Sequence, residues 1–302
     1  MTPALDSSTL FRVDGIVAVI TGGGSGLGQT MAHALAANGA RRVYILGRRQ
    51  DALATTAAAY PGVIVPHPAD VTSKPALQAA VDRITSETGY VNLVIANAGT
   101  IGPAVRFSPT ASLAELRQTL FTDFSMEGMN DALGLNITAA FFTMTAFLEL
   151  LDAGNARALA GGYGKPLQEG SAVPAIQSQV IFTTSISAFS RHWSSAPPYL
   201  ASKVAVMQIA KHASTQLARF GVRVNALAPG IYPSELAAGL INTRNPEEEP
   251  FEDQRFIPAR RFGGDEEMAG AILYLASRAG SYSNGSILVT DGGRLSVMQA
   301  TY

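Results

Sequence analysis

The chain has 302 residues, and its 22 lysines and arginines are balanced by 23 aspartates and glutamates, which gives a net charge of −1. This balance excludes the general basic character with which nucleic-acid-binding and membrane-surface proteins attract their partners. Charged residues make up 15% of the chain and hydrophobic residues 47%, which indicates a large core and excludes disorder as the main state. The absence of cysteine excludes disulfides, thiolate metal sites and cysteine nucleophiles.

Neither a targeting signal nor a membrane span is expected. The first 14 residues include charged side chains and lack the apolar run of a secretory signal, which predicts a cytoplasmic protein. The best candidate for a span, Leu135–Leu151, is interrupted by Asn136, three threonines and Glu149. The length fits one decorated α/β domain, because single α/β units reach roughly 250 residues.

Seven short apolar runs are continuous and rich in β-branched residues, as expected for strands that are covered on both faces. These runs are Ile16–Ile20, Val43–Leu46, Val63–Val65, Leu93–Ala96, Val180–Phe182, Val222–Val224 and Ile287–Val289. Helical patterns alternate with them, at Leu27–Leu35, Ala52–Tyr60, Ala76–Glu87, Ile137–Leu151, Ser202–Phe220 and Asp265–Ser277. The alternation predicts an α/β fold with a doubly wound, seven-stranded parallel sheet.

Three segments are longer than the usual connections of about 2–6 residues. Residues 100–131, with one helical pattern around Leu113–Leu120, and residues 152–179, rich in Gly, Ala and Pro, are expected to be insertions. Residues 231–261 contain four prolines and the acidic run Glu247–Glu249, which is expected to be a solvated face rather than a metal site. Since no linker divides the chain, a single domain over residues 1–302 is predicted.

A glycine-rich turn connects the first predicted strand to the first predicted helix, where residues 21–28 read TGGGSGLG. Glycines let the backbone turn tightly and approach a pyrophosphate, and the N-terminus of the helix supplies N–H groups and a partial positive charge. The candidate cofactor-binding residues of the turn are Gly22, Gly24, Ser25, Gly26, Leu27 and Gly28. A purely structural turn is the alternative, but the position directly after the first strand favours a dinucleotide site.

The end of the second predicted strand indicates which dinucleotide would bind. Gly47 stands where an acidic residue would hold the ribose 2′-hydroxyl of NAD, and it is followed by Arg48 and Arg49. A guanidinium at this position can hold a 2′-phosphate through charge-assisted hydrogen bonds. Arg48 is therefore predicted to select NADP(H), and two ordinary surface charges at a helix start are the alternative.

Tyr199 and Lys203 are four residues apart at the start of a predicted helix, so their side chains share one face. The pKa of a free tyrosine, near 10, is too high for efficient proton exchange at neutral pH, and the neighbouring ammonium, helped by an oxidised nicotinamide ring, is expected to lower it. Ser185, close to the end of the preceding strand, can donate a hydrogen bond to a substrate carbonyl. Although such a Tyr–Lys pair alone is often a surface pair, the combination makes Tyr199 a candidate general acid.

Together and in this order, the motifs resemble those of the short-chain dehydrogenase/reductase family over nearly the whole chain. The further matching motifs are Asp70-Val71, Asn97-Ala98-Gly99, Asn136, Pro229-Gly230 and Asp291-Gly292-Gly293. The resemblance implies a Rossmann-type single domain that binds a nicotinamide cofactor, and a homodimer or homotetramer.

The resemblance also implies a role for each matched residue. Ser185 would orient the substrate, Tyr199 would be the acid/base and Lys203 would bind the ribose. Asn136 would keep a water relay beside the lysine. The other implied cofactor contacts are Asp70 and Val71 at the adenine, Asn97, Ala98 and Gly99 along the cleft, Pro229 and Gly230, Ile231 at the nicotinamide carboxamide, and Ser234 in the position of a family threonine.

The segment 229–235 and the insertions look like those of fungal secondary-metabolism reductases and rhamnolipid-type β-ketoacyl reductases. An NADPH-dependent reductase of a ketone or β-keto substrate is therefore expected, with residues 231–261 as the substrate-binding loop and no metal, nucleic acid or membrane as partner. The alternatives are a non-redox or cofactor-sensing protein on the same fold, or an NAD-dependent alcohol dehydrogenase, which would need an acidic residue near Gly47.

Aromatic and histidine side chains give weaker signals. His192 and Trp193 are candidates for a substrate wall or for a loop anchor. An apolar substrate pocket is expected of Phe107, Phe189 and Tyr232, and a core or subunit contact is the alternative. Structural or surface roles are expected of His33, His67 and His212, because none recurs at the spacing of metal ligands.

Overall fold

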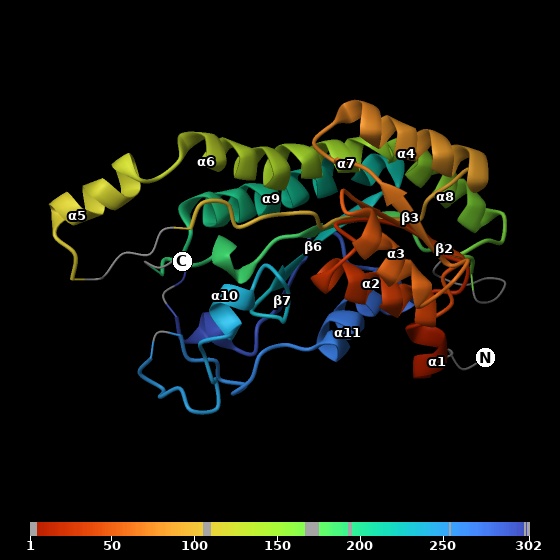
Figure 1. The fold of residues 1–302 in the computed structure, drawn as a ribbon. Helices are drawn as coiled ribbons and strands as arrows, with labels where there is room; N and C mark the ends of the chain where they lie inside the picture. Colours follow the sequence, from red (N-terminus) through yellow and green to blue (C-terminus); the bar gives the residue numbers. More distant parts are fainter. Residues whose placement is uncertain are drawn as a thin grey trace.

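The computed structural model describes residues 5–104, 110–166, 175–192, 195–253, 255–298 and 300. Seven parallel strands form one sheet in the order β3-β2-β1-β4-β5-β6-β7, with helices on both faces (Figure 1). The predicted doubly wound, Rossmann-type sheet is confirmed. Its strands are β1 (Val17–Thr21), β2 (Arg42–Gly47), β3 (Ile64–Pro68), β4 (Leu93–Ala96), β5 (Gln179–Thr183), β6 (Arg223–Pro229) and β7 (Ile287–Thr290).

Helices cover the sheet in two layers, one on each face. One face of the sheet is covered by α2 (Gly26–Ala37), α3 (Gln50–Ala58) and α11 (Asp265–Ala276). The other is covered by α4 (Lys74–Glu87), α7 (Ala140–Ala146), α8 (Leu148–Leu159) and α9 (Pro197–Gln216). The other described helices are α1 (Ser7–Leu10), α5 (Leu113–Arg117), α6 (Met126–Leu133) and α10 (Ala238–Ile241). The described π-helical turns are Gln118–Thr122 and Gly134–Ala139, and the 3-10 turns are Ile186–Ala188, Ala218–Phe220, Arg278–Gly280 and Arg294–Ser296.

Each central strand sends alternate side chains into two separate cores. In β1, Val17 and Val19 belong to the core under α4 and α9, whereas Ala18 and Ile20 belong to the core under α2 and α11. Every residue of β1 is buried. Burial on both faces explains why the strand sequences are continuously apolar, and each buried Val or Ile side chain contributes about 1.5–3 kcal/mol relative to an exposed one.

The helix predicted over Ile137–Leu151 is longer than its sequence pattern. It begins as α6 at Met126, passes through the π-helical turn into α7, and continues as α8 to Leu159. Ala132 is the buried residue of α6, so this part of the helix contributes little to the core.

No single helix within the described ranges is long and apolar enough to cross a membrane, although residues 126–146 and 148–159 pass such a test as a pair bent by 45°. Met144 and Leu151 of this pair, and Phe147 between its two members, are buried in the core against the sheet.

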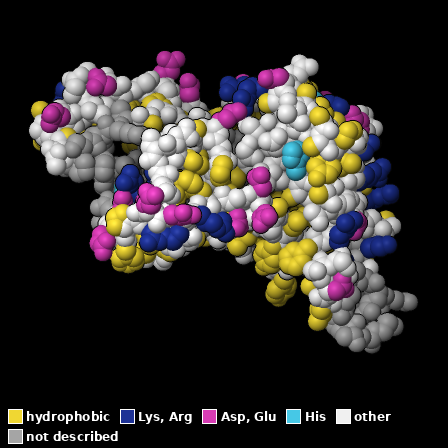
Figure 2. Space-filling view, turned by 60° about the horizontal axis from the view of Figure 1, so that its bottom comes forward, with side chains coloured by type: hydrophobic (Ala, Val, Ile, Leu, Met, Phe, Trp, Pro, Cys, Tyr) yellow, Lys and Arg dark blue, Asp and Glu magenta, His cyan; other side chains and the backbone are white. Residues whose placement is uncertain are grey.

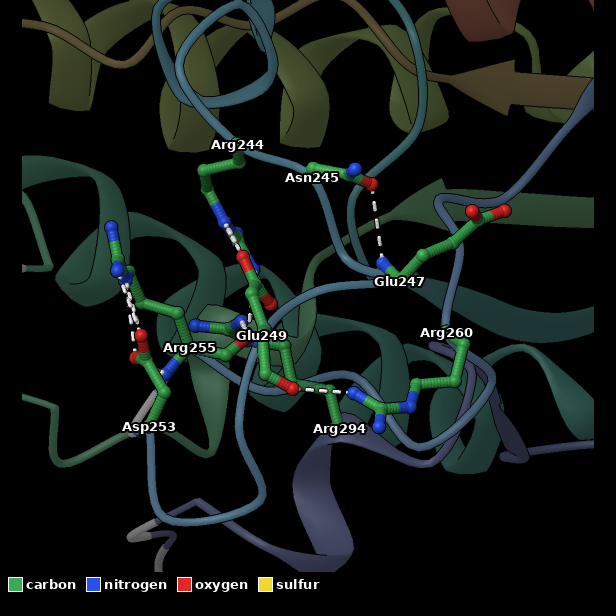
Figure 3. A network of polar contacts seen from close by, with 8 residues as sticks. All are labelled: Arg244, Asn245, Glu247, Glu249, Asp253, Arg255, Arg260 and Arg294. Carbon is green, nitrogen blue, oxygen red and sulfur yellow. Dashed lines mark hydrogen bonds and ion pairs between the residues drawn. The ribbon is translucent and has the colours of Figure 1, made fainter.

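The segment after β6 is fastened by a buried ion pair (Figure 3). Arg244 donates from Nε and Nη2 to the Glu249 carboxylate at 2.7 and 2.8 Å, and the two side chains are 5% and 7% exposed. Arg244 also donates to the Arg255 carbonyl at 2.7 Å, and Arg260 donates to the Glu249 carbonyl. The prediction of a solvated face is therefore wrong at Glu249, whose carboxylate neutralises a buried guanidinium, while Glu247 and Glu248 are exposed.

Glu249→Ala is expected to lower the free energy of unfolding by about 3–5 kcal/mol, because Arg244 would keep its buried charge without a carboxylate. Chemical denaturation of the variant and the parent protein measures the difference. Glu248→Ala, at the exposed neighbour, is the matched control and is expected to change stability by less than about 0.5 kcal/mol. Equal effects of the two substitutions would contradict the buried pair.

Candidate active site

The carboxyl ends of the parallel strands meet at a cavity of about 560 Å³. Loops at the ends of such strands are where ligands bind in open α/β sheets. The predicted site residues that line this cavity are Gly22, Gly24, Ser25, Gly26, Leu27, Arg48, Asp70, Val71, Asn97, Ala98, Gly99, Ser185, Tyr199, Lys203, Pro229, Gly230 and Ser234. Three other predicted residues, Gly28, Asn136 and Ile231, lie outside its lining.

The glycine turn leaves no room for side chains. A Cβ at Gly28 would lie 2.2 Å from the Gly22 carbonyl oxygen, so Gly28 serves the close packing of α2 against the turn. Gly26 has a φ of +51°, and a Cβ there would lie 3.0 Å from the Ser234 Cβ. Ser25, the N-cap of α2, makes no capping hydrogen bond through its side chain, which leaves the N–H groups of the first turn available to an anion.

Thr21 and Asn97 tie the ends of β1 and β4 together. The Thr21 hydroxyl oxygen accepts hydrogen bonds from the N–H groups of Asn97 at 3.0 Å and of Ala98 at 3.1 Å. In return, the Asn97 amide donates to the Thr21 carbonyl at 3.0 Å. Thr21 is 2% exposed and is not among the predicted binding residues, although it is the first residue of the TGGGSGLG motif.

Ser185 and Tyr199 line the cavity together, near enough for the serine hydroxyl to influence the pKa of the phenol. The Ser185 oxygen accepts the N–H of Ser187 at 3.1 Å, which fixes the serine side chain at the end of β5. Burial raises the pKa of Tyr199, and the Ser185 hydroxyl opposes that rise. The phenol is therefore protonated at neutral pH.

The lowering of the Tyr199 pKa that the sequence predicted from Lys203 is not what the structure shows. Desolvation dominates, and the Lys203 Nζ lies 5.5 Å from the centre of the Tyr199 ring. The ammonium instead donates to the Thr183 carbonyl at 2.8 Å.

Lys203 is buried, with 4% of its surface exposed, and desolvation lowers its pKa from 10.5 to about 8. In the part of the chain that the structure describes, no carboxylate pairs with it. Its backbone is fixed as well, because the Thr184 hydroxyl donates to the Lys203 carbonyl at 2.7 Å. The end of β5 thus holds both ends of the lysine.

Asn136 lies on the π-helical turn Gly134–Ala139, and its amide connects three elements. Its Oδ1 accepts the Thr100 N–H at 2.8 Å, while its Nδ2 donates to the Thr100 carbonyl at 2.8 Å and to the Ser202 hydroxyl at 2.9 Å. Ser202 in turn donates to the Tyr199 carbonyl at 2.7 Å. Asn136 therefore positions the first turn of α9, through a serine that no sequence signal distinguished.

The two arginines after β2 have different surroundings. Arg49 donates to the Glu235 carboxylate at 3.0 and 2.8 Å and to the Ser25 hydroxyl at 3.0 Å. Arg48 is exposed, lines the cavity and makes no hydrogen bond or ion pair with any described residue. The guanidinium donors of Arg48 are therefore open to a ligand. Glu235 is not among the predicted site residues, because it lies 186 residues from Arg49 in sequence.

The remaining candidates are dispersed. Ile231 lines a second cavity of about 420 Å³ beside α11 and β7, and Tyr232 lines both cavities. Phe189 and His192 are half-buried and line neither cavity. Phe107 and Trp193 lie outside the described residues.

Histidines and surface charges add no second site. The His33 ring contacts the Thr56 carbonyl at 3.0 Å. Among the described residues, no group of three or more His, Asp or Glu side chains could hold a metal ion. On the face that Figure 2 shows, acidic and basic side chains lie next to one another over much of the surface.

Comparison with known proteins gives consistent matches over nearly the whole chain. A family model described as enoyl-(acyl carrier protein) reductase matches residues 22–294. The short-chain dehydrogenase/reductase SAT3 of Stachybotrys chartarum is 57% identical, over 90% of this chain and 100% of the relative. The rhamnolipids biosynthesis 3-oxoacyl-[acyl-carrier-protein] reductase of Pseudomonas aeruginosa is 29% identical, over 94% of this chain and 97% of the relative. Among solved structures, the Pseudomonas aeruginosa RhlG/NADP active-site complex superposes with a TM-score of 0.75 at 28% identity, covering 97% of this chain and 99% of that one.

Proposed function

The chain belongs to the short-chain dehydrogenase/reductase family, and from this premise we propose that it is an NADPH-dependent reductase of a ketone or β-keto substrate. The observation that carries the proposal is that Ser185, Tyr199 and the buried Lys203 line one cavity, with the Lys203 Nζ 5.5 Å from the centre of the Tyr199 ring. Further parts of the proposal are one domain over residues 1–302, residues 231–261 as the substrate-binding loop, and a homodimer or homotetramer in the cytoplasm.

The residues of the cleft fit a nicotinamide dinucleotide. The uncapped N-terminus of α2 suits the pyrophosphate, and the Lys203 ammonium, which has a carbonyl as its acceptor, suits the neutral hydroxyls of a ribose. Asp70 and Val71 would contact the adenine, and Arg48 would hold the 2′-phosphate. The RhlG structure that this chain resembles is a complex with NADP. When bound, NADPH supplies the hydride.

Within the chain, Tyr199 is the proton donor of the proposed reaction. Because burial raises its pKa, the phenol carries the proton that the substrate oxygen needs once hydride reaches the carbonyl carbon. The Ser185 hydroxyl orients the carbonyl oxygen by donating a hydrogen bond to it. Lys203 holds the ribose hydroxyls and, with Asn136 and water, returns a proton to Tyr199.

Tyr199→Phe is expected to lower kcat about 10²–10⁴-fold and to leave the Kd of NADPH unchanged, because the ring remains and the transferable proton is lost. NADPH consumption with a panel of ketones and β-keto thioesters measures turnover, and cofactor fluorescence measures binding. The matched control is Tyr274→Phe, since that tyrosine is 37% exposed on α11. Near-normal turnover of Tyr199→Phe would refute the proposed proton donor.

Arg48→Ala is expected to raise the Kd of NADPH about 10- to 100-fold and to leave the Kd of NADH unchanged, because hydrogen bonds to a charged phosphate are lost. Equilibrium titration with each cofactor gives the two constants. Arg41→Ala is the control, since Arg41 precedes β2 at the opposite end of the strand. An unchanged ratio of the two constants in Arg48→Ala would show that Arg48 does not select the phosphate.

A further inference from the structure

The chain that follows β6 passes along the rim of the cofactor cleft and meets the opposite rim. Ser234, Glu235 and Ala237 line the same cavity as Ser25 and Arg49, which belong to the glycine turn and to the loop after β2. The two rims are far apart in sequence, and they meet because the chain after β6 folds back toward the glycine turn. We call residues 233–243 the cleft flap.

An ion pair and a close backbone approach join the flap to the opposite rim. Arg49 donates through both terminal nitrogens to the two carboxylate oxygens of Glu235, and it also donates to the Ser25 hydroxyl. The Ser234 Cβ lies only 3.0 Å from the position that a Cβ on Gly26 would take, so the flap and the glycine turn are in close contact. One guanidinium thereby connects the flap, the loop after β2 and the N-cap of α2.

The two ends of the flap are fixed independently of this ion pair. Tyr232, directly before the flap, is 6% exposed and packs against Gly263. Arg244, directly after it, forms the buried pair with Glu249. In contrast, the side chains of Arg49 and Glu235 are 55% and 67% exposed. The flap is therefore anchored at its ends by buried contacts and held to the opposite rim by an exposed pair that can open without disturbing the core.

We propose that the Arg49–Glu235 ion pair is a latch that retains the dinucleotide in the cleft, so that Glu235 and Arg49 are positioning residues that set how fast the cofactor leaves. The proposal rests on the proposed function only in that the cleft binds a nicotinamide dinucleotide. The latch gives Arg48 and Arg49 different roles. Arg49, whose donors are used by Glu235 and Ser25, closes the flap over either cofactor, and Arg48 recognises the 2′-phosphate.

The experiment measures the dissociation rates of NADPH and NADH by stopped-flow displacement. Glu235→Gln keeps the shape of the side chain and removes its charge, and it is expected to speed the release of both cofactors by the same factor, about two- to fivefold for an exposed pair. Arg49→Gln is expected to do the same. The exchange of charges, Arg49→Glu with Glu235→Arg, is expected to restore slow release, which a merely structural role would not do.

Asp14→Asn is the matched control, because Asp14 forms a similarly exposed pair with Arg12 outside the cleft, and its release rates are expected to equal those of the parent protein. Unchanged release in Glu235→Gln would overturn the latch. Selectively slower release of NADPH in that variant would also overturn it, because Arg49, once freed, would then be a phosphate ligand. Failure of the parent protein to bind either cofactor would instead refute the proposed function and remove the premise of the latch.

Discussion

The buried ammonium of Lys203 is the constraint on which the geometry of the site depends. A charge in this position needs acceptors, and the chain supplies one from the end of β5, the Thr183 carbonyl. The next residue, Thr184, holds the Lys203 backbone, so the first turns of α9 are fixed against the sheet. Tyr199, one helical turn earlier, is thereby placed beside Ser185. Its phenol is protonated, as the proposed carbonyl reduction requires.

This arrangement has a cost in stability that the two cores must offset. The pKa of Lys203 lies near 8 in the folded protein, below that of a lysine in an unfolded chain, so the folded state binds this proton less tightly. The penalty is therefore present at neutral pH and fades as pH rises from about 8 to 10.5. The sheet is covered by helices on both faces, and its central strands pack side chains into both cores. The stability of these cores offsets the cost of the desolvated ammonium at the carboxyl end of β5.

Sequence predicted those features that local pattern determines. The five inner strands are buried on both faces and are recognisable in sequence as continuous apolar runs, whereas the edge strands β3 and β7 are apolar but only partly buried. The spacing of Tyr199 and Lys203 places them on one helix face. Pairings between distant segments had no such signal. Arg49 and Glu235 look like ordinary surface charges in sequence, and nothing in the run Glu247–Glu249 marks its last carboxylate as the buried one. The desolvation that raises the pKa of Tyr199 had no sequence signal, because a charge four residues away is visible in sequence, whereas burial of the phenol is not.

We expect acceptor oxygens of a bound dinucleotide to complete the hydrogen bonding of the Lys203 ammonium. Proton uptake on NADPH binding tests this expectation most directly. Calorimetric titrations near pH 8.5, in two buffers of different ionisation enthalpy, give the number of protons taken up. New acceptors stabilise the ammonium and raise its pKa above about 8, so uptake is expected in the parent protein and should be lost in Lys203→Met. Binding without proton uptake, or with the same uptake in Lys203→Met, would contradict the account.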